Sequence, residues 1–151
     1  MGYNHSKFMN LALNEAKKGY KEGGVPVGAV MVVGDHIIGR GYNKRVQLGD
    51  PTAHGEMDCL RNAGRSPDYR QATIYTTLSP CMMCAGTIVQ FGINTVVIGE
   101  NENFPGNIEF LKERSVNVIL LNDDECKKVM RKFIEEKPEL WHEDIAGRTN
   151  V

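Results

Sequence analysis

Apolar residues in the first part of the chain follow a helical period and then two strand-like runs. Between residues 6 and 19 they recur at spacings of one to four that place them on one helix face: Phe8, Leu11, Ala12 and Ala16. Residues 27–33 then form a nearly continuous apolar run, which is typical of a central strand. A two-residue turn at 34–35 leads into a second strand over residues 36–42. The pattern therefore predicts a helix followed by an antiparallel hairpin.

Helical and strand-like patterns alternate through the rest of the chain. A short helix is predicted over residues 52–63, and three apolar runs are typical of buried strands: 72–76, 95–99 and 116–121. Because helical segments separate these three strands, we expect the strands to lie parallel in one sheet. The antiparallel hairpin belongs to the same sheet, so a mixed sheet is predicted.

Two further helix starts are indicated by their local sequence. Ser79 is a good N-cap and Pro80 suits the first helical position, which predicts a helix that runs from there to Phe91. Asn122, with Glu125 three residues later, is typical of a capping box at the start of the last helix. That helix carries an apolar stripe and is predicted to end at Pro138: Cys126, Val129, Met130, Phe133 and Ile134.

The length and charge of the chain fit one folded domain without a basic surface. With 151 residues, of which 41% are hydrophobic, residues 1–151 are predicted to form a single domain around one core. The formal net charge of −1 argues against general binding to nucleic acid or to an anionic membrane. No apolar run has the length to cross a bilayer and residues 1–10 lack a secretory signal, so a cytoplasmic protein is expected.

The residues with the clearest chemistry lie in two short motifs. His54 and Glu56 form an H-x-E motif, and Cys81 and Cys84 follow Pro80 in a P-C-x-x-C motif. This combination is the signature of zinc nucleobase deaminases. One imidazole and two thiolates hold Zn²⁺ with a fourth position open for water, as in catalytic zinc sites. The zinc lowers the pKa of that water, which becomes a nucleophile near neutral pH.

The predicted helix starts favour the same interpretation. Cys81 and Cys84 are three residues apart in a first helical turn, so they share a face, and the helix N-terminus favours their thiolates. Glu56 is predicted to carry protons between the water, the base and the departing amine. Because residues i and i+2 of a regular helix do not face each other, we expect an irregular helix start to orient His54 and Glu56 together.

Six longer stretches, spread over nearly the whole chain, can be compared with a known family: GYKEGGVP (19–26), GRGYN (39–43), HGE (54–56), YTTLSPC (75–81), GENENF (99–104) and WHED (141–144). They resemble the small zinc-dependent cytosine deaminases of the fungal type, within the cytidine-deaminase-like superfamily. The resemblance implies a three-layer α/β/α fold with a mixed five-stranded sheet, and a homodimer. It also implies hydrolytic deamination of free cytosine to uracil and ammonia by zinc-bound hydroxide, a step of pyrimidine salvage.

The same resemblance implies roles for individual residues. It places one zinc ion per chain on His54, Cys81 and Cys84, and it makes Glu56 the proton shuttle. The implied contacts to the base come from the Asn43 side chain and the Gly55 N–H on the pyrimidine edge, the Ser79 carbonyl and the Asp144 carboxylate at the exocyclic amine, and the rings of Phe104 and Trp141 above the base. The loop over residues 105–107 is shorter than the family pattern.

Other functions stay open at this point. The chain is also similar to tRNA adenosine deaminases and guanine deaminases, although those usually carry Ala and Glu where this chain has Gly55 and Ser79. A non-catalytic module with structural zinc needs four protein ligands, and no fourth candidate has suitable spacing. A thiol oxidoreductase would use Cys81 and Cys84 as a redox pair.

Overall fold

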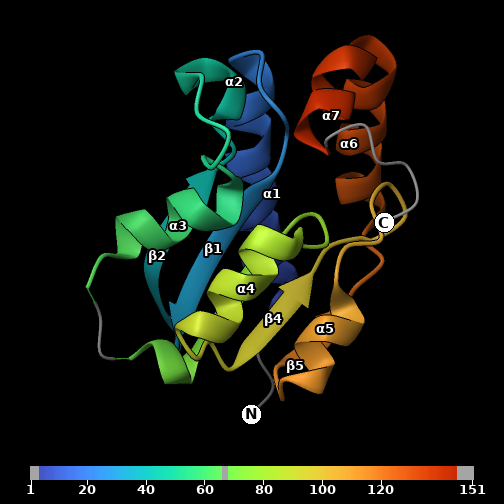
Figure 1. The fold of residues 1–151 in the computed structure, drawn as a ribbon. Helices are drawn as coiled ribbons and strands as arrows, with labels where there is room; N and C mark the ends of the chain where they lie inside the picture. Colours follow the sequence, from blue (N-terminus) through green and yellow to red (C-terminus); the bar gives the residue numbers. More distant parts are fainter. Residues whose placement is uncertain (1–3, 66–67, 146–151) are drawn as a thin grey trace.

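A computed structural model describes residues 4–65 and 68–145, so the predicted domain ends at residues 1 and 151 lie outside the described residues (Figure 1). Five strands form one sheet in the order β2-β1-β3-β4-β5: β1 Gly28–Val33, β2 His36–Tyr42, β3 Ala72–Thr76, β4 Thr95–Ile98 and β5 Asn117–Leu120. β1 pairs antiparallel with β2 and β3, whereas β3, β4 and β5 are parallel. The prediction of a mixed five-stranded sheet is confirmed.

Helices cover both faces of the sheet, because successive strand residues point to opposite sides (Figure 1). Ala29 and Met31 of β1 belong to one hydrophobic cluster, which includes residues of α3 (Gly55–Ala63), α4 (Met82–Gln90) and α5 (Ile108–Glu113). Val30 and Val32 belong to a second cluster, with residues of α1 (His5–Lys21) and α6 (Asp124–Glu136). The predicted three-layer α/β/α fold is therefore confirmed.

A third hydrophobic cluster lies where the parallel strands end. Leu78 follows β3 and Phe104 follows β4, and both pack with Trp141 of α7 (Pro138–Asp144). The other buried members are Val25, Val27, Met130 and Phe133. Because the carboxyl ends of parallel strands meet at one edge of a sheet, loops from distant parts of the sequence converge here.

The start of α4 differs from the prediction. Cys81 is the N-cap, and its Sγ accepts a hydrogen bond from the N–H of Cys84 at 3.5 Å. Ser79 precedes the helix because it is bound to a neighbouring loop instead. Its N–H donates to the carbonyl of Glu100 at 2.9 Å, and its hydroxyl donates to the carbonyl of Pro105 at 2.9 Å.

Two more predicted helices begin later than expected, and Pro138 belongs to a further helix that was not predicted. Asp123, not Asn122, caps α6, because its carboxylate accepts a hydrogen bond from the N–H of Cys126 at 2.9 Å. Pro138 occupies the first turn of α7, a position that proline suits, after α6 has ended at Glu136. The helix expected over residues 52–63 begins only at 55.

The short elements do not show in the apolar pattern, because one or two helical turns are too short to display a period. These are α2 (Arg45–Leu48), α5, α7 and the 3₁₀ turn Tyr69–Gln71. Among the described residues, no helix combines the length and apolar character needed to span a membrane.

Candidate metal centre and active site

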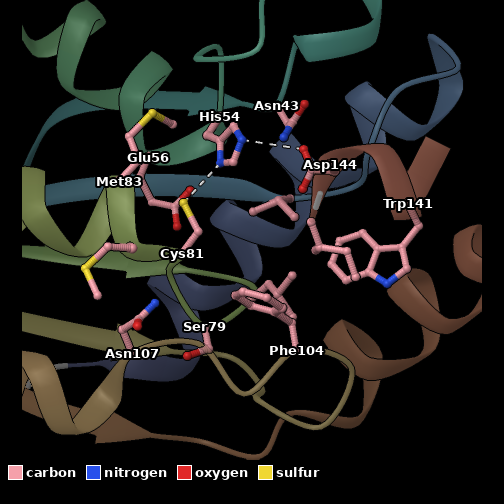
Figure 2. Close-up of a pocket in the computed structure, with 14 residues that line it drawn as sticks. Asn43, His54, Glu56, Ser79, Cys81, Met83, Phe104, Asn107, Trp141 and Asp144 are labelled. Atoms are coloured by element: carbon pink, nitrogen blue, oxygen red, sulfur yellow. Dashed lines mark hydrogen bonds and ion pairs between the residues drawn. The ribbon is translucent and has the colours of Figure 1, made fainter. Parts of the chain in front are cut away.

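The three predicted metal ligands, which come from two helix starts, meet at this end of the sheet. Figure 2 shows His54 beside Cys81. Nδ1 of His54 lies 3.5 Å from Sγ of Cys81 and 3.7 Å from Sγ of Cys84. Nitrogen and sulfur ligands of a tetrahedral zinc ion are about 3.6 Å apart, given ordinary Zn–N and Zn–S bonds. Among residues 4–65 and 68–145, this trio is the group of metal-ligating side chains whose atoms lie within 4.8 Å of one another. Its geometry and donor atoms fit one zinc ion with an open fourth position.

The start of α3 explains how His54 and Glu56 face the same cavity. His54 is the N-cap, with extended backbone angles (φ −74°, ψ 161°), and the helix begins at Gly55. This irregular start is the one expected, and both side chains line the pocket (Figure 2). A Cβ on Gly55 would lie 2.8 Å from the carbonyl oxygen of Val27. The α3 backbone thus packs directly on the segment before β1, at a distance that excludes alanine unless the backbone moves.

The site strongly changes the protonation of its groups. Hydrogen bonds from Cys84 and His54 lower the pKa of Cys81 to about 4 despite its burial. Burial alone would lower the pKa of His54, but the hydrogen bond with Cys81 and the charge of Asp144 outweigh it and raise the pKa to about 9. Burial raises the pKa of Glu56 to about 7. Perturbed groups gathered in one cavity are common at functional sites.

The metal ligands open into a cavity of about 400 Å³. It contains most of the predicted site residues, whereas Gly55 and Cys84 are buried beside it. The lining residues are Val27, Asn43, His54, Glu56, Leu78, Ser79, Cys81, Met82, Met83, Phe104, Asn107, Trp141, Asp144 and Ile145.

Two polar side chains of this cavity, Asn43 and Asp144, lie next to His54 (Figure 2). The Asn43 oxygen Oδ1 accepts a hydrogen bond from the N–H of Arg45 at 2.9 Å, so the amide nitrogen is the group turned toward Asp144 (Figure 2). Oδ1 of Asp144 is buried and accepts no hydrogen bond within the described part of the chain. Burial raises the pKa of Asp144. The cavity therefore offers an amide donor and a carboxylate acceptor side by side.

Aromatic rings close another side of the cavity. Phe104 meets Trp141 edge to face, with ring centroids 6.1 Å apart. The loop before Phe104 is held by the fully buried Glu100, whose carboxylate accepts hydrogen bonds from the N–H groups of Glu102 and Asn103 at 2.7 and 3.0 Å. Phe104 thus reaches the cavity even though the loop that follows it is short.

Sequence reasoning missed three residues that shape this site. Glu100 fixes the loop that carries Phe104, and its signal is a glutamate directly after an apolar strand. Asn107 lines the cavity and donates to the carbonyl of Pro80 at 3.2 Å. Arg45 joins α2 to α7, and nothing in the periodic pattern marks it.

Comparisons with known proteins agree with this geometry. Residues 3–100 match the model of the family described as the cytidine and deoxycytidylate deaminase zinc-binding region. A cytosine deaminase of Candida albicans is 49% identical over 149 residues, which cover 97% of this chain and 99% of that protein. A tRNA-specific adenosine deaminase of Buchnera aphidicola is 37% identical over 145 residues, covering 87% of this chain and 95% of that protein.

A solved structure from a study of A-to-I editing by tRNA:A34 deaminases has a TM-score of 0.70 and 30% sequence identity. It covers 82% of this chain and 99% of its own. The zinc-binding family and the cluster of His54, Cys81 and Cys84 together confirm the prediction of one zinc ion per chain. We conclude that this chain belongs to the cytidine and deoxycytidylate deaminase zinc-binding family.

Proposed function

We propose that this protein is a zinc-dependent cytosine deaminase that hydrolyses free cytosine to uracil and ammonia. The observation that carries the proposal is the placement of Asp144 and Asn43 next to His54, in a cavity partly closed by Trp141. The 49% identity to a protein named cytosine deaminase, over nearly the full length of both chains, supports the same substrate.

The polar groups of the cavity complement the edge of cytosine. The base carries a donor amine at C4 and acceptors at N3 and O2. The carboxylate of Asp144 and the carbonyl of Ser79 would accept from the amine. The amide of Asn43 and the N–H of Gly55 would donate to O2, while Phe104 and Trp141 cover the ring.

Proton transfer falls to Glu56 in this proposal. A zinc ion bound by the cluster supplies a Lewis acid that activates water near neutral pH. Glu56 would pass one proton of the attacking water to N3, where it stays, and then pass the second, from the hydroxyl now on C4, to the amine. A C4–O bond forms, the C4–N bond breaks, and ammonia leaves uracil behind. Glu56 is buried beside the metal ligands, which keeps its proton away from bulk water.

Deamination of adenosine in tRNA is the second candidate, because a relative with that name is 37% identical to this chain. Two observations favour a free base instead. Trp141, Asp144 and Ile145 line the cavity from α7 and the residue after it, and the net charge of −1 lacks the basic excess of nucleic-acid-binding proteins.

We also propose that residues 1–151 act as one zinc deaminase domain, in a cytoplasmic homodimer of pyrimidine salvage that has no nucleic-acid or membrane partner. The exposed Phe91 at the end of α4 supports the dimer, because it is 46% exposed and could pack on a partner subunit. A Cβ on Gly86 of the same helix would meet no atom within 4 Å, so a partner subunit could approach the backbone closely there. Light scattering after size exclusion should give twice the chain mass, and Gly86→Arg should reduce it to one chain.

An ammonia-release assay tests the reaction. The panel contains free cytosine, guanine and adenine, their nucleosides and a tRNA anticodon stem-loop, with zinc measured on the same sample. We expect turnover of cytosine by protein that carries about one zinc per chain. Turnover of guanine or of the stem-loop without turnover of cytosine would assign the chain to another deaminase class.

A further inference from the structure

The side chain of Arg45 connects the start of α2 with the last turn of α7. One guanidinium nitrogen pairs with the carboxylate of Glu143, and another donates to the carbonyl of Glu143 at 3.3 Å. The third, Nε, lies 3.5 Å from Oδ1 of Asp144. The Arg45 and Asp144 side chains are only 15% and 9% exposed, so solvent screens their contact less than that of an ordinary surface pair, whereas Glu143 is 61% exposed.

The backbone of Arg45 is held as firmly as its side chain. Its N–H donates to Oδ1 of Asn43 at 2.9 Å, and its carbonyl accepts from the N–H of Asp50 at 3.2 Å. One residue therefore contacts both polar groups that lie next to His54, Asn43 through its backbone and Asp144 through its side chain.

The helix α7 depends on such contacts. It contains seven residues, and a helix of that length is not stable without tertiary support. A cation near the carbonyls of the last turn also interacts favourably with the helix dipole. At the other end, Nζ of Lys137 donates to the carbonyl of Gly23 at 3.3 Å.

We propose that Arg45 is a positioning residue. It holds α7 over the cavity and places Asp144 next to Asn43 at the spacing that the base requires. The proposal rests on the proposed function in so far as it names the base. The docking of α7 by Arg45 is a property of the fold, so it can be measured without any substrate.

Trp141 provides the measurement, because it is the single tryptophan of the sequence and lies buried on α7. Quenching of its fluorescence by acrylamide therefore reports whether α7 stays docked. Arg45→Met keeps the length of the side chain and removes the guanidinium. Arg131→Met is the matched control, because Arg131 lies on the neighbouring α6 in a half-exposed pair with Glu102 at 3.8 Å.

With zinc content unchanged, Arg45→Met should raise the quenching constant of Trp141 at least twofold and the KM for cytosine at least tenfold. In Arg45→Lys the quenching constant and the KM should rise less than in Arg45→Met, but they should not return to the wild-type values. An ammonium cannot reproduce the three contacts of a guanidinium. Arg131→Met should match the wild type. Equal quenching constants and KM values for Arg45→Met and Arg131→Met would overturn the proposal.

A second variant keeps the proposal testable if Arg45→Met does not fold. Glu143→Gln leaves Arg45 and Asp144 in place and removes one charge from the contact. The quenching constant of Trp141 and the KM should therefore both rise, but by less than expected for Arg45→Met. A Glu143→Gln protein with the wild-type quenching constant and KM would then overturn the proposed role of Arg45. If the wild type does not deaminate cytosine, the proposed function fails, and the quenching of Trp141 still decides the role of Arg45.

Discussion

Oδ1 of Asp144 lies 3.5 Å from Nε2 of His54, so a carboxylate of the last helix faces a metal ligand of α3. His54 directs its other nitrogen, Nδ1, at the sulfur of Cys81 (Figure 2) and at that of the adjacent Cys84. A carboxylate placed behind a ligand imidazole orients the ring and tunes its basicity. Asp144 lies beside His54 and also lines the cavity, so we expect its replacement to affect both metal binding and substrate use.

Asp144→Ala should weaken substrate use more than metal binding. We expect a KM at least tenfold higher, because the base loses its carboxylate acceptor. Zinc should remain stoichiometric at micromolar concentration, although its affinity falls by about 10- to 100-fold. Steady-state kinetics and a competitive chelator titration measure the two effects. An unchanged KM would remove Asp144 from the substrate site.

Glu56→Gln should keep zinc and lose nearly all turnover. The amide preserves the size of the side chain but cannot shuttle a proton, and a positioned acid–base group contributes about 10²- to 10⁴-fold to the rate. Turnover and metal content are measured on the same preparation. Glu125→Gln, on the surface of α6, serves as the control and should behave as the wild type. Persistent turnover in Glu56→Gln would assign the proton transfer to another group.

Cys84→Ala should lose zinc and activity together, because two remaining protein ligands do not hold the ion tightly. The matched control is Cys126→Ala, which removes another buried thiol far from the motif in sequence and should retain one zinc per chain. Elemental analysis and the ammonia assay give both results. An active Cys84→Ala protein with its zinc intact would contradict the ligand set. Removal of zinc from the wild type by a chelator should abolish turnover. A thiol oxidoreductase would stay active without the metal.

Gly55→Ala should destabilise the protein, because the new Cβ would lie 2.8 Å from the carbonyl oxygen of Val27. Overpacking of this kind costs about 1–3 kcal/mol. Asn14→Ala is the control, because Asn14 is exposed within α1 and alanine favours a helix. Urea unfolding measures both variants. Equal stability of Gly55→Ala and the wild type would show that the start of α3 can shift freely.

The hydrogen bond from Tyr42 to Glu22 should make the stability of the protein depend on pH. Its hydroxyl donates to the carboxylate of Glu22 at 2.7 Å, which, with burial, raises the pKa of Tyr42 to about 12. Because this pKa lies above the unfolded value of about 10, the contribution is complete below pH 10 and is lost as the pH rises toward 12. Tyr42→Phe should therefore be less stable than the wild type at pH 8, with a difference that shrinks above pH 10. Urea unfolding across this range measures it, and a constant difference would contradict the assignment.

The order of helices and strands could be predicted because each longer element has its own apolar period. The run at residues 72–76 coincides with β3, and the helix predicted over residues 6–19 lies within α1. The start of α4 could not be predicted in the same way. Ser79 is bonded to Glu100 and Pro105, which are more than 20 residues away, and these contacts outweigh its local capping preference.

The sequence by itself predicted the chemistry of the site, because the H-x-E and P-C-x-x-C motifs that contain His54, Cys81 and Cys84 are typical of zinc deaminases. Only the tertiary structure decided which other groups meet them. Asp144 reaches His54 because the short helix α7 folds back over the ends of the strands, and Arg45 contacts this helix from the other half of the chain. Contacts between such distant residues leave no periodic trace in a single sequence, since they depend on how the packed layers bring loops together.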